Sequence, residues 1–566
     1  MSGPDGQPGT EPEYAPPVDP WAAAEAEHRA ALEAERQAAL MESADHPTPD
    51  HFPTATAPME TEPVHAAAQQ VTPAQRVPTE IALIDSDSVD TAAPGTFPAE
   101  AGLSRPAAAA GGRGLAAYRR VILWGAAIVT VVVAVSAAAL VFWWPRDGAA
   151  LDFRALRDVR TLPAAESASF LATRVTGDRT YLASAPTDGT LVVSAVHTAT
   201  GAEIWRSEAA GDAATWKHII GVPGEDTVVA IGKPDSSDSA LRMVVLGGHK
   251  GTLQWERPLG ADDKVLFIGG TVVVAEQEDA QVVGLDLHKG TTRWDNPTPK
   301  DTSGGTATAL VAATTAADLA APADAAGVAF APATEDERFV QIGADRSAQV
   351  FEAASGKLVT RRPNVAEPAD IVVAHDDTLF VASAQHGYQI VRYDLGDLGQ
   401  PALVYAASDS RRQLTRVTPC DTDRLCLVDT VGYDATTADV VAVDVGGKGQ
   451  LWRVPVPDAE TLVPVGASVL VGRNTSPDTV RLLDGKGATS WDSPGAAVRL
   501  DRGNLLLFAK PLPDNASDVS VAGRHLGDEP VQLGPMTGAV TSSCSWNAEI
   551  IACAADDGFV LRRFVG

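Results

Sequence analysis

Three histidines recur beside glycine-containing turns: His197, His249 and His288. Imidazole is the side chain most suited to metal binding and to proton transfer near neutral pH. Each of the three belongs to a different copy of a repeated segment, so we expect them at separate points on a rim, as solvated turn residues. We therefore predict no metal ligands among them.

Three pairs of adjacent aspartates offer carboxylates for calcium binding or general acid catalysis: Asp262 with Asp263, Asp376 with Asp377, and Asp556 with Asp557. All three pairs fall in predicted turns, where an Asp side chain hydrogen-bonds its own backbone. We interpret them as turn residues. Glycine-rich phosphate loops, GxSxG elbows and HExxH motifs do not occur in the sequence, so we assign no catalytic or cofactor-binding residues.

The four cysteines all lie in the C-terminal part of the chain: Cys420, Cys426, Cys544 and Cys553. Four cysteines allow three pairings, and loop closure favours the local one. We predict two hairpin disulfides, Cys420 with Cys426 and Cys544 with Cys553, as expected outside the cytosol. A zinc site is the alternative, but neither pair has the spacing of a zinc knuckle.

A repeated pattern must position these residues: a strand, a tight turn containing Gly, and a strand with Trp four residues after the Gly. Its copies contain Gly201 and Trp205, Gly251 and Trp255, Gly290 and Trp294, Gly487 and Trp491, with a shifted glycine before Trp452 and a copy without Trp at 352–357. Such self-similarity is typical of a β-propeller. Each Trp can fill the space between neighbouring blades.

The turns of this pattern fall near residues 197–205, 247–255, 286–294, 352–360, 394–404, 444–452, 483–491 and 525–533. They predict an all-β fold, a propeller of eight blades with seven as the alternative. The closing strands follow the last turn, so we expect the last blade to include a strand from the start of the domain. Residues 303–329 and 235–239 look like insertions. Loops on a rigid ring often carry binding sites, so these are candidate partner surfaces.

The repeat resembles that of the quinoprotein-like, or PQQ-repeat, propellers, whose pattern is Ala-x-Asp-x-x-Thr-Gly-x-x-x-Trp. The matching residues are Ala195, Thr200, Gly201 and Trp205, with His197 in place of Asp, and then Asp286, Gly290 and Trp294. The resemblance covers roughly residues 160–566. It implies a propeller that is similar either to PQQ-carrying dehydrogenases or to cofactor-free scaffolds such as an outer-membrane assembly lipoprotein. The enzymes often have a vicinal Cys pair, and this sequence has no adjacent cysteines.

Residues 1–117 are acidic and rich in Pro and Ala, with five Arg and no Lys. Such a composition buries too little apolar surface to fold, so we predict a disordered tail. Residues 21–43 are an exception, because strong helix formers and Glu-to-Arg spacings favour a helix there. That helix is either solvated or a partner-docking segment.

Residues 121–144 contain no charge. As a helix they would span about 36 Å, enough to cross a bilayer. Arg113, Arg119 and Arg120 precede the span and Arg146 follows it, so the positive-inside rule places the tail in the cytoplasm. More than 100 residues precede the span, which favours a signal anchor over a cleavable signal peptide. The propeller, residues 151–566, would then be extracytoplasmic.

The sequence thus predicts a single-pass membrane protein with a non-enzymatic propeller outside the cytoplasm. That propeller would be a binding scaffold or sensor for an envelope protein or cell-wall component, and the tail would bind a cytoplasmic partner. The alternative is a membrane-tethered PQQ-dependent dehydrogenase. The chain has 73 acidic residues against 44 Lys and Arg, a net charge of −29, which disfavours nucleic acid as a partner.

Overall fold

The computed structural model describes residues 148–566 except 236–239, 333–335, 384–386, 476–477, 511–518 and 556–557. The predicted tail (1–117), its helix-forming stretch (21–43) and the predicted membrane span (121–144) lie outside the described residues. Within the described ranges, no helix has both the length and the apolar character needed to span a bilayer. The regular structure of this part is almost entirely β-strand, with one short 3-10 helix, η1 (Asp318–Ala320).

Two burial patterns along the strands explain how they assemble. The strand β11 (Thr271–Glu276) contains the continuous apolar run 272–275, and every residue except the last is buried. The strand β13 (Thr292–Pro297) instead alternates between exposed and half-buried positions. A strand covered on both faces by neighbouring sheets has to be apolar throughout, whereas an outer strand needs only one apolar face.

The strands of the described part form seven four-stranded sheets and one eight-stranded sheet. The eight-stranded sheet consists of two four-stranded units joined by a short parallel pairing between β14 (Ala309–Thr314) and β18 (Ile371–His375). Counted as antiparallel units of four strands, the described part therefore contains nine.

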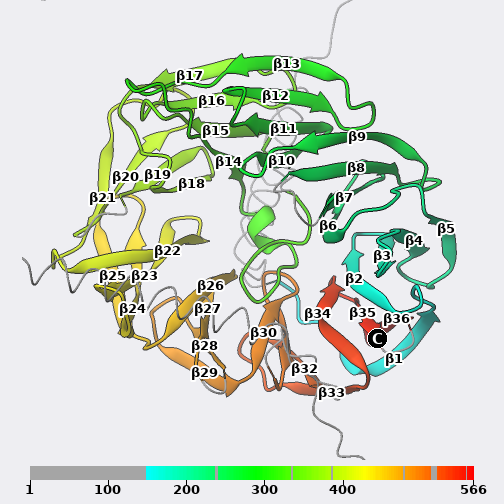
Figure 1. Cartoon of the computed structure of the whole chain (residues 1–566). Coiled ribbons are helices and arrows are strands. Elements are labelled where there is room, and N and C mark those ends of the chain that lie inside the picture. The colour runs from blue at the N-terminus through cyan, green and yellow to red at the C-terminus, as the bar shows by residue number, and fades with distance from the viewer. Residues whose placement is uncertain are drawn as a thin grey trace, which may run out of the picture. The chain divides into compact units, whose positions relative to one another are not determined.

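Each unit runs from an inner to an outer strand (Figure 1). The first four are β2 (Ala168–Val175), β3 (Arg179–Pro186), β4 (Val192–His197), β5 (Glu203–Ser207); β6 (Thr215–Val222), β7 (Thr227–Lys233), β8 (Leu241–Gly247), β9 (Leu253–Leu259); β10 (Lys264–Ile268), β11, β12 (Gln281–Asp286), β13; and β14, β15 (Arg338–Ile342), β16 (Ala348–Glu352), β17 (Leu358–Arg362). The next three are β18, β19 (Thr378–Ala382), β20 (Gln389–Asp394), β21 (Ala402–Ala406); β22 (Arg412–Asp421), β23 (Arg424–Val431), β24 (Asp434–Asp444), β25 (Gly449–Pro455); and β26 (Ala459–Val465), β27 (Ser468–Arg473), β28 (Thr479–Leu483), β29 (Thr489–Pro494). The last two are β30 (Ala496–Arg499), β31 (Asn504–Phe508), β32 (Val519–His525), β33 (Val531–Met536); and β34 (Ala539–Trp546), β35 (Ile550–Ala555), β36 (Gly558–Val565), β1 (Phe153–Leu162).

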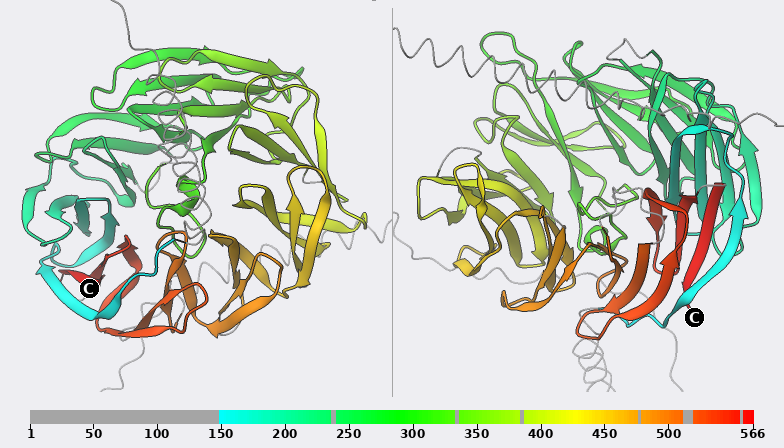
Figure 2. Two further views of the ribbon diagram at one scale, coloured as in Figure 1. Left: turned by 180° about the vertical axis from the view of Figure 1, so that it is seen from behind. Right: turned by 60° about the horizontal axis from the view of Figure 1, so that its bottom comes forward.

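The units follow one another around a ring, with the first strand of each nearest the centre (Figure 1). The closing unit takes its outer strand from the start of the domain, because β1 pairs antiparallel with β36 from Phe153 with Val565 to Leu162 with Phe559. Seen from behind, β1 lies along the outside of the C-terminal strands (Figure 2). The predicted shared blade is thus confirmed, and the fold is a β-propeller.

The predicted count of eight blades is not confirmed. Each of the eight predicted turns falls between the third and the outer strand of a unit, as at β4 to β5 and β32 to β33. The closing unit has no such turn, because its third strand, β36, ends the chain and its outer strand, β1, begins the domain. A count of turns therefore omits this unit.

The repeated tryptophans connect each unit to the next. Trp205 donates its indole N–H to the carbonyl of Gly248, at 2.6 Å, in the following unit. The same contact is made by Trp255 to Leu287, Trp294 to Ala353 and Trp452 to Gly485. The turn glycine of the following unit lies against the ring: a Cβ at Gly251 would meet Trp205, and a Cβ at Gly487 would meet Trp452.

Two positions depart from this pattern. Gly201 of the first unit lies against Arg160 of β1 rather than against a tryptophan. Trp491 has no hydrogen-bond partner for its buried indole nitrogen within the described part, and the guanidinium of Arg524 instead lies 5.1 Å from the centroid of its ring. The boundary between units therefore accepts the aliphatic stem of an arginine as well as an indole.

Replacing Gly290 by Ala should show how much the packing of the turn glycine against Trp255 contributes to stability beyond the effect of backbone strain. Gly290 has φ +66° and its Cβ would lie 2.6 Å from the Trp255 ring, whereas Gly269 has φ +51° with no atom within 4 Å. Both substitutions strain a left-handed residue. Only Gly290→Ala also overpacks the unit boundary, so we expect it to cost about 1–3 kcal/mol more than Gly269→Ala in chemical denaturation. Equal losses for the two variants would contradict a packing role for Gly290.

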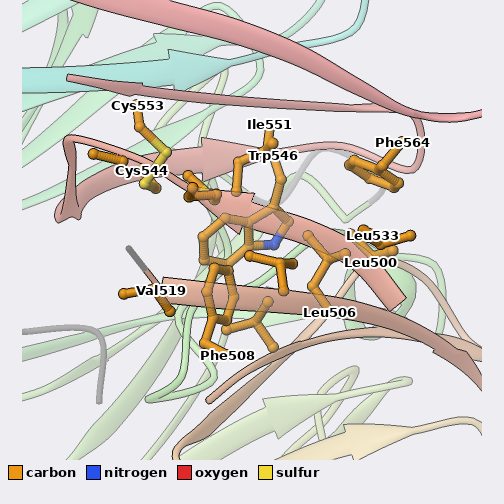
Figure 3. Packing of buried hydrophobic residues seen from close by; sticks show 14 of the residues in the cluster. Leu500, Leu506, Phe508, Val519, Leu533, Cys544, Trp546, Ile551, Cys553 and Phe564 are labelled. Atoms are coloured by element: carbon orange, nitrogen blue, oxygen red, sulfur yellow. A yellow bond between two sulfur atoms is a disulfide. The ribbon is translucent and has the colours of Figure 1, made fainter. Parts of the chain in front are cut away.

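Buried aromatic and aliphatic side chains fill the boundary between the closing unit and its neighbour. Trp546 is 1% exposed and lies between Phe508 and the Cys544–Cys553 disulfide (Figure 3). The joint with the first unit combines an apolar cluster, in which Leu182 packs with Phe559 and Leu561, with a hydrogen bond that Thr173 on β2 donates to the backbone oxygen of Ser543 at 2.7 Å. These contacts close the ring.

Candidate functional site: a filled channel and a rim cavity

A cavity of about 340 Å³ lies where turns of two neighbouring units meet, and we call it the rim cavity. Its lining includes His249, from the β8–β9 turn, and His288, from the β12–β13 turn. The β6–β7 turn supplies a carboxylate to each histidine. The Nε2 atom of His249 lies 3.1 Å from Asp226 Oδ2, and that of His288 lies 2.9 Å from Glu225 Oε2.

This arrangement corrects the expectation that the three histidines lie at separate points. His249 and His288 line one cavity because the repeat places equivalent turns of adjacent units side by side. His197 occupies the same turn position in the first unit, where it is exposed. The carboxylates of Glu225 and Asp226 belong to a Pro-Gly-Glu-Asp turn, which was the available sequence signal for this site.

The rim cavity presents paired polar and charged groups. Arg179 Nη1 lies 3.0 Å from Asp226 Oδ1, so the Asp226 carboxylate is shared between Arg179 and His249. No group of three or more His, Cys, Asp or Glu residues in the described part could hold a metal ion. Paired imidazoles and carboxylates at an open turn suit the recognition of polar groups on a partner.

A second feature is the centre of the ring, where residues 315–332 lie; we call them the central segment (Figure 1). They connect β14 to β15 and include η1. The predicted insertion, 303–329, was expected to project as a partner surface. Its residues 309–314 instead form β14, and the rest from 315 onward turns inward and packs against inner strands of the ring.

Aromatic and backbone contacts hold the central segment in place. Phe330 packs edge-on against Trp546 on β34, with 4.7 Å between ring centroids. The guanidinium of Arg174, on β2, lies 5.4 Å from the Phe330 ring centroid. The backbone N–H of Ala323 donates to the carbonyl of Arg499, on β30, at 3.1 Å. The segment therefore bridges strands from both ends of the chain.

Arg499 is the most buried charge in contact with the central segment, with 2% of its surface exposed. Its Nε donates to the Ala321 carbonyl at 2.7 Å, and its Nη1 donates to the Pro464 carbonyl at 2.9 Å. Burial lowers the pKa of Arg499 to about 10. Sequence reasoning missed this residue; the available signal was a lone Arg within the apolar run 496–500.

The stability of the ring should fall as the solution is acidified, because a buried histidine lies beside the central segment. Burial lowers the pKa of His375, whose Nδ1 lies 3.1 Å from Thr314 Oγ1. Below about pH 6.5 the unfolded chain binds a proton that the folded chain does not, so stability is lost as pH falls. One such proton contributes at most about 1.4 kcal/mol per pH unit. The free energy of unfolding, measured with urea between pH 7.5 and 5, should fall less steeply with decreasing pH in His375→Gln than in wild type. An equally steep fall in the variant would contradict this origin.

The predicted cysteine pairs are both present as disulfides, Cys420–Cys426 and Cys544–Cys553. Each links the two strands of a hairpin, β22 with β23 and β34 with β35. The alternative zinc site is therefore replaced by two local crosslinks.

Two of the three aspartate pairs form turns. Asp263 accepts hydrogen bonds from the backbone N–H groups of Gly260 and Gln277. Asp376 and Asp377 both have positive φ, of 42° and 62°, between β18 and β19. Asp556 and Asp557 lie outside the described residues.

Sequence reasoning also missed a buried charge network in the unit β22–β25, at its boundary with the preceding unit. The Asp429 side chain has no exposed surface, and it accepts hydrogen bonds from Arg412 and Arg453 at 2.8 and 2.9 Å. Tyr388 donates to its other oxygen at 2.8 Å. Burial, and then the negative charge of Asp429, raise the pKa of Tyr388 well above its usual range. All the charges are satisfied within the network, which points to a structural role.

A match to a known protein family supports the interpretation of the repeated Gly–Trp pattern. Residues 174–397 match a family model described as outer membrane protein assembly factor BamB. That model is built from the PQQ-type repeat, so the predicted resemblance to the quinoprotein-like propellers is confirmed over this segment. Curated proteins gave no significant match.

The solved structures that are similar to the chain include the following three. The BamB protein of Moraxella catarrhalis is 16% identical, with a TM-score of 0.36, over 72% of this chain and 98% of that chain. A eukaryotic initiation factor is 12% identical, with a TM-score of 0.45, over 71% and 92%. A europium-containing methanol dehydrogenase is 12% identical, with a TM-score of 0.34, over 62% and 85%.

Proposed function

We propose that this protein is a single-pass membrane protein whose extracytoplasmic propeller, with its nine units counted as blades, is a non-enzymatic binding scaffold or sensor for an envelope partner. The central segment carries the proposal. The chain's own residues occupy the middle of the ring, so the turns around the rim are the surface available to a partner protein or wall component. The match to a model described as an outer membrane assembly factor supports protein binding.

The location outside the cytoplasm rests on three features of the chain. The uncharged span 121–144 is preceded by basic residues, and both disulfides lie in the propeller. Disulfides persist in oxidising compartments, and the positive-inside rule leaves the acidic tail in the cytoplasm. The tail is then free to bind a cytoplasmic partner.

An introduced cysteine tests this topology, because all four native cysteines are in disulfides. Tyr433 is 92% exposed, and a membrane-impermeant thiol reagent should label Tyr433→Cys on intact cells. Ser43→Cys, in the tail, should be labelled only after permeabilisation. The reverse pattern would overturn the proposed orientation.

The channel residues fit PQQ poorly. PQQ is a flat quinone with three carboxylates, and the cavity of about 400 Å³ beside the central segment is lined by one arginine, Arg499, and one carboxylate, Asp318. The enzymes' vicinal cysteine pair has no counterpart here, since each cysteine is bonded within its own hairpin. The dehydrogenase alternative would require PQQ-dependent and Ca²⁺-dependent dye reduction by the purified protein.

The binding role is tested by crosslinking full-length protein in its native membrane and comparing three variants. We expect His249→Ala and His288→Ala to reduce a specific crosslinked species. His197→Ala, at the equivalent turn of the first unit, should leave it unchanged. A species recovered equally from all three would exclude the rim cavity as the contact. Dye reduction without any crosslinked species would favour the enzyme.

A further inference from the structure

Besides the rim, the ring contains an internal cavity of about 400 Å³ next to the central segment, which we call the channel cavity. Its volume is within the range of small-molecule sites. Most of its walls are small and apolar, with Ala317, Ala321, Ala329, Ala331, Pro223, Pro332, Gly327 and Leu319 among the lining residues. Thr314, Asp318 and Arg499 are the polar members.

The guanidinium of Arg499 lies at the wall of this cavity. It donates to the carbonyl of Ala321, which itself lines the cavity. Its two hydrogen bonds both go to backbone carbonyls, at Ala321 and Pro464, and these carry no charge. Among the described residues Arg499 forms no ion pair, and burial alone accounts for its lowered pKa.

A guanidinium buried without a counter-charge is costly unless an anion neutralises it. Asp318 also lines the cavity, where its carboxylate accepts hydrogen bonds from the backbone N–H and hydroxyl of Thr315, at 2.7 and 3.1 Å, but its charge does not contribute to the shift in the pKa of Arg499. A second guanidinium, that of Arg174, packs on Phe330. Phe330 lies in the sequence between Ala329 and Ala331, which both line the cavity. Arg174 has the negative charge of Asp324 nearby, which favours its charged form, so among these described guanidinium groups Arg499 is the one without a charged partner.

We propose that the channel cavity binds a small organic anion, whose carboxylate or phosphate pairs with Arg499 while its body packs against the alanine walls. Guanidinium groups recognise both oxyanions through paired, charge-assisted hydrogen bonds. The ligand would also contact the central segment, so binding would hold that segment against β30. The inference goes beyond the partner-binding role, because it concerns the interior of the ring and needs no second protein.

The test uses purified full-length protein in nanodiscs, with succinate and inorganic phosphate as separate probes at constant ionic strength. Binding is followed by calorimetry and by the rise in unfolding temperature. We expect wild type to bind one probe, which identifies the oxyanion. Arg499→Met should weaken that binding at least about tenfold, and Arg499→Lys should weaken it less, because lysine keeps the charge but loses the paired geometry.

Because Arg499 also positions the central segment, substituting it could disturb the fold as well as the cavity. A second variant separates these two causes of lost binding. Ala331→Leu keeps Arg499 but narrows the cavity, and it should abolish binding while the protein remains folded. Arg524→Met is the control, because Arg524 is a half-buried arginine whose pKa is also lowered mainly by burial but which stacks on Trp491 instead. It should bind as wild type does.

Absence of binding of both probes to wild type, or equal binding by Ala331→Leu, would overturn the proposal. Either result leaves the crosslinking test unaffected.

Discussion

Replacing Asp429 by Ala should destabilise the propeller by about 3–5 kcal/mol, the loss seen when one partner of a buried ion pair is removed. Asp429 accepts hydrogen bonds from Arg412, Arg453 and Tyr388, and its side chain has no exposed surface. Without it, two guanidinium groups share only Asp439. The loss should appear as a lower urea midpoint with an unchanged slope.

Asp409→Ala is the matched control for this prediction. Asp409 also bonds an arginine, Arg411 at 2.8 Å, but that arginine's side chain is 74% exposed. Solvent screens such a pair, so little change is expected. If both substitutions had the same small effect, the network around Asp429 would contribute nothing beyond surface pairing.

Removing residues 151–162 should prevent cooperative folding of the ring altogether. This deletion takes away β1, and with it the buried side chains of Phe153 and Leu162 and the whole pairing with β36. Phe153 stacks on Phe564, with 6.2 Å between centroids, and fills the space beside Gly523. Each buried side chain contributes roughly 1.5–3 kcal/mol, so the loss is of the order of the whole stability of a typical domain.

Near-ultraviolet circular dichroism and size-exclusion chromatography would detect this loss as absent tertiary signal and an enlarged, aggregating species. A synthetic peptide of residues 148–163 should restore part of the signal by pairing with β36. The interpretation would be wrong if the shortened chain unfolded cooperatively at the wild-type temperature, because the ring would then close without β1.

The spacing of Gly and Trp, together with degenerate copies of the same turn that lack Trp, was enough to predict the class of fold and the position of eight turns. A turn glycine with positive φ and a tryptophan four residues later are local signals, and the contact between Trp255 and Gly290 repeats them from unit to unit. The blade number was harder to predict, because the closing unit lacks the turn that the pattern detects. The cysteine pairs were predictable because each spans a short loop.

The channel and the rim cavity could not be predicted from local patterns. An Ala-rich insertion gives no sign of whether it points outward or inward. Phe330, the lone aromatic residue of the central segment, is informative only once Trp546 and Arg174 are known to contact it. Likewise, His249 and His288 converge because two turns from adjacent units end at one place. The distance between these two turns depends on how adjacent units are rotated relative to each other, and this rotation cannot be predicted from the sequence of one repeat.

The pairing of β1 with β36 also has a consequence for biosynthesis. Asp158 and Arg562, which hydrogen-bond across this pair, are 404 positions apart in the chain. At about 5–20 residues per second, roughly 20–80 s pass between translation of the two strands. The first strand of the domain to be made must therefore wait, unpaired, until the last is complete. During that interval the growing chain exposes a strand edge to aggregation, and a prematurely terminated polypeptide can never form the final unit.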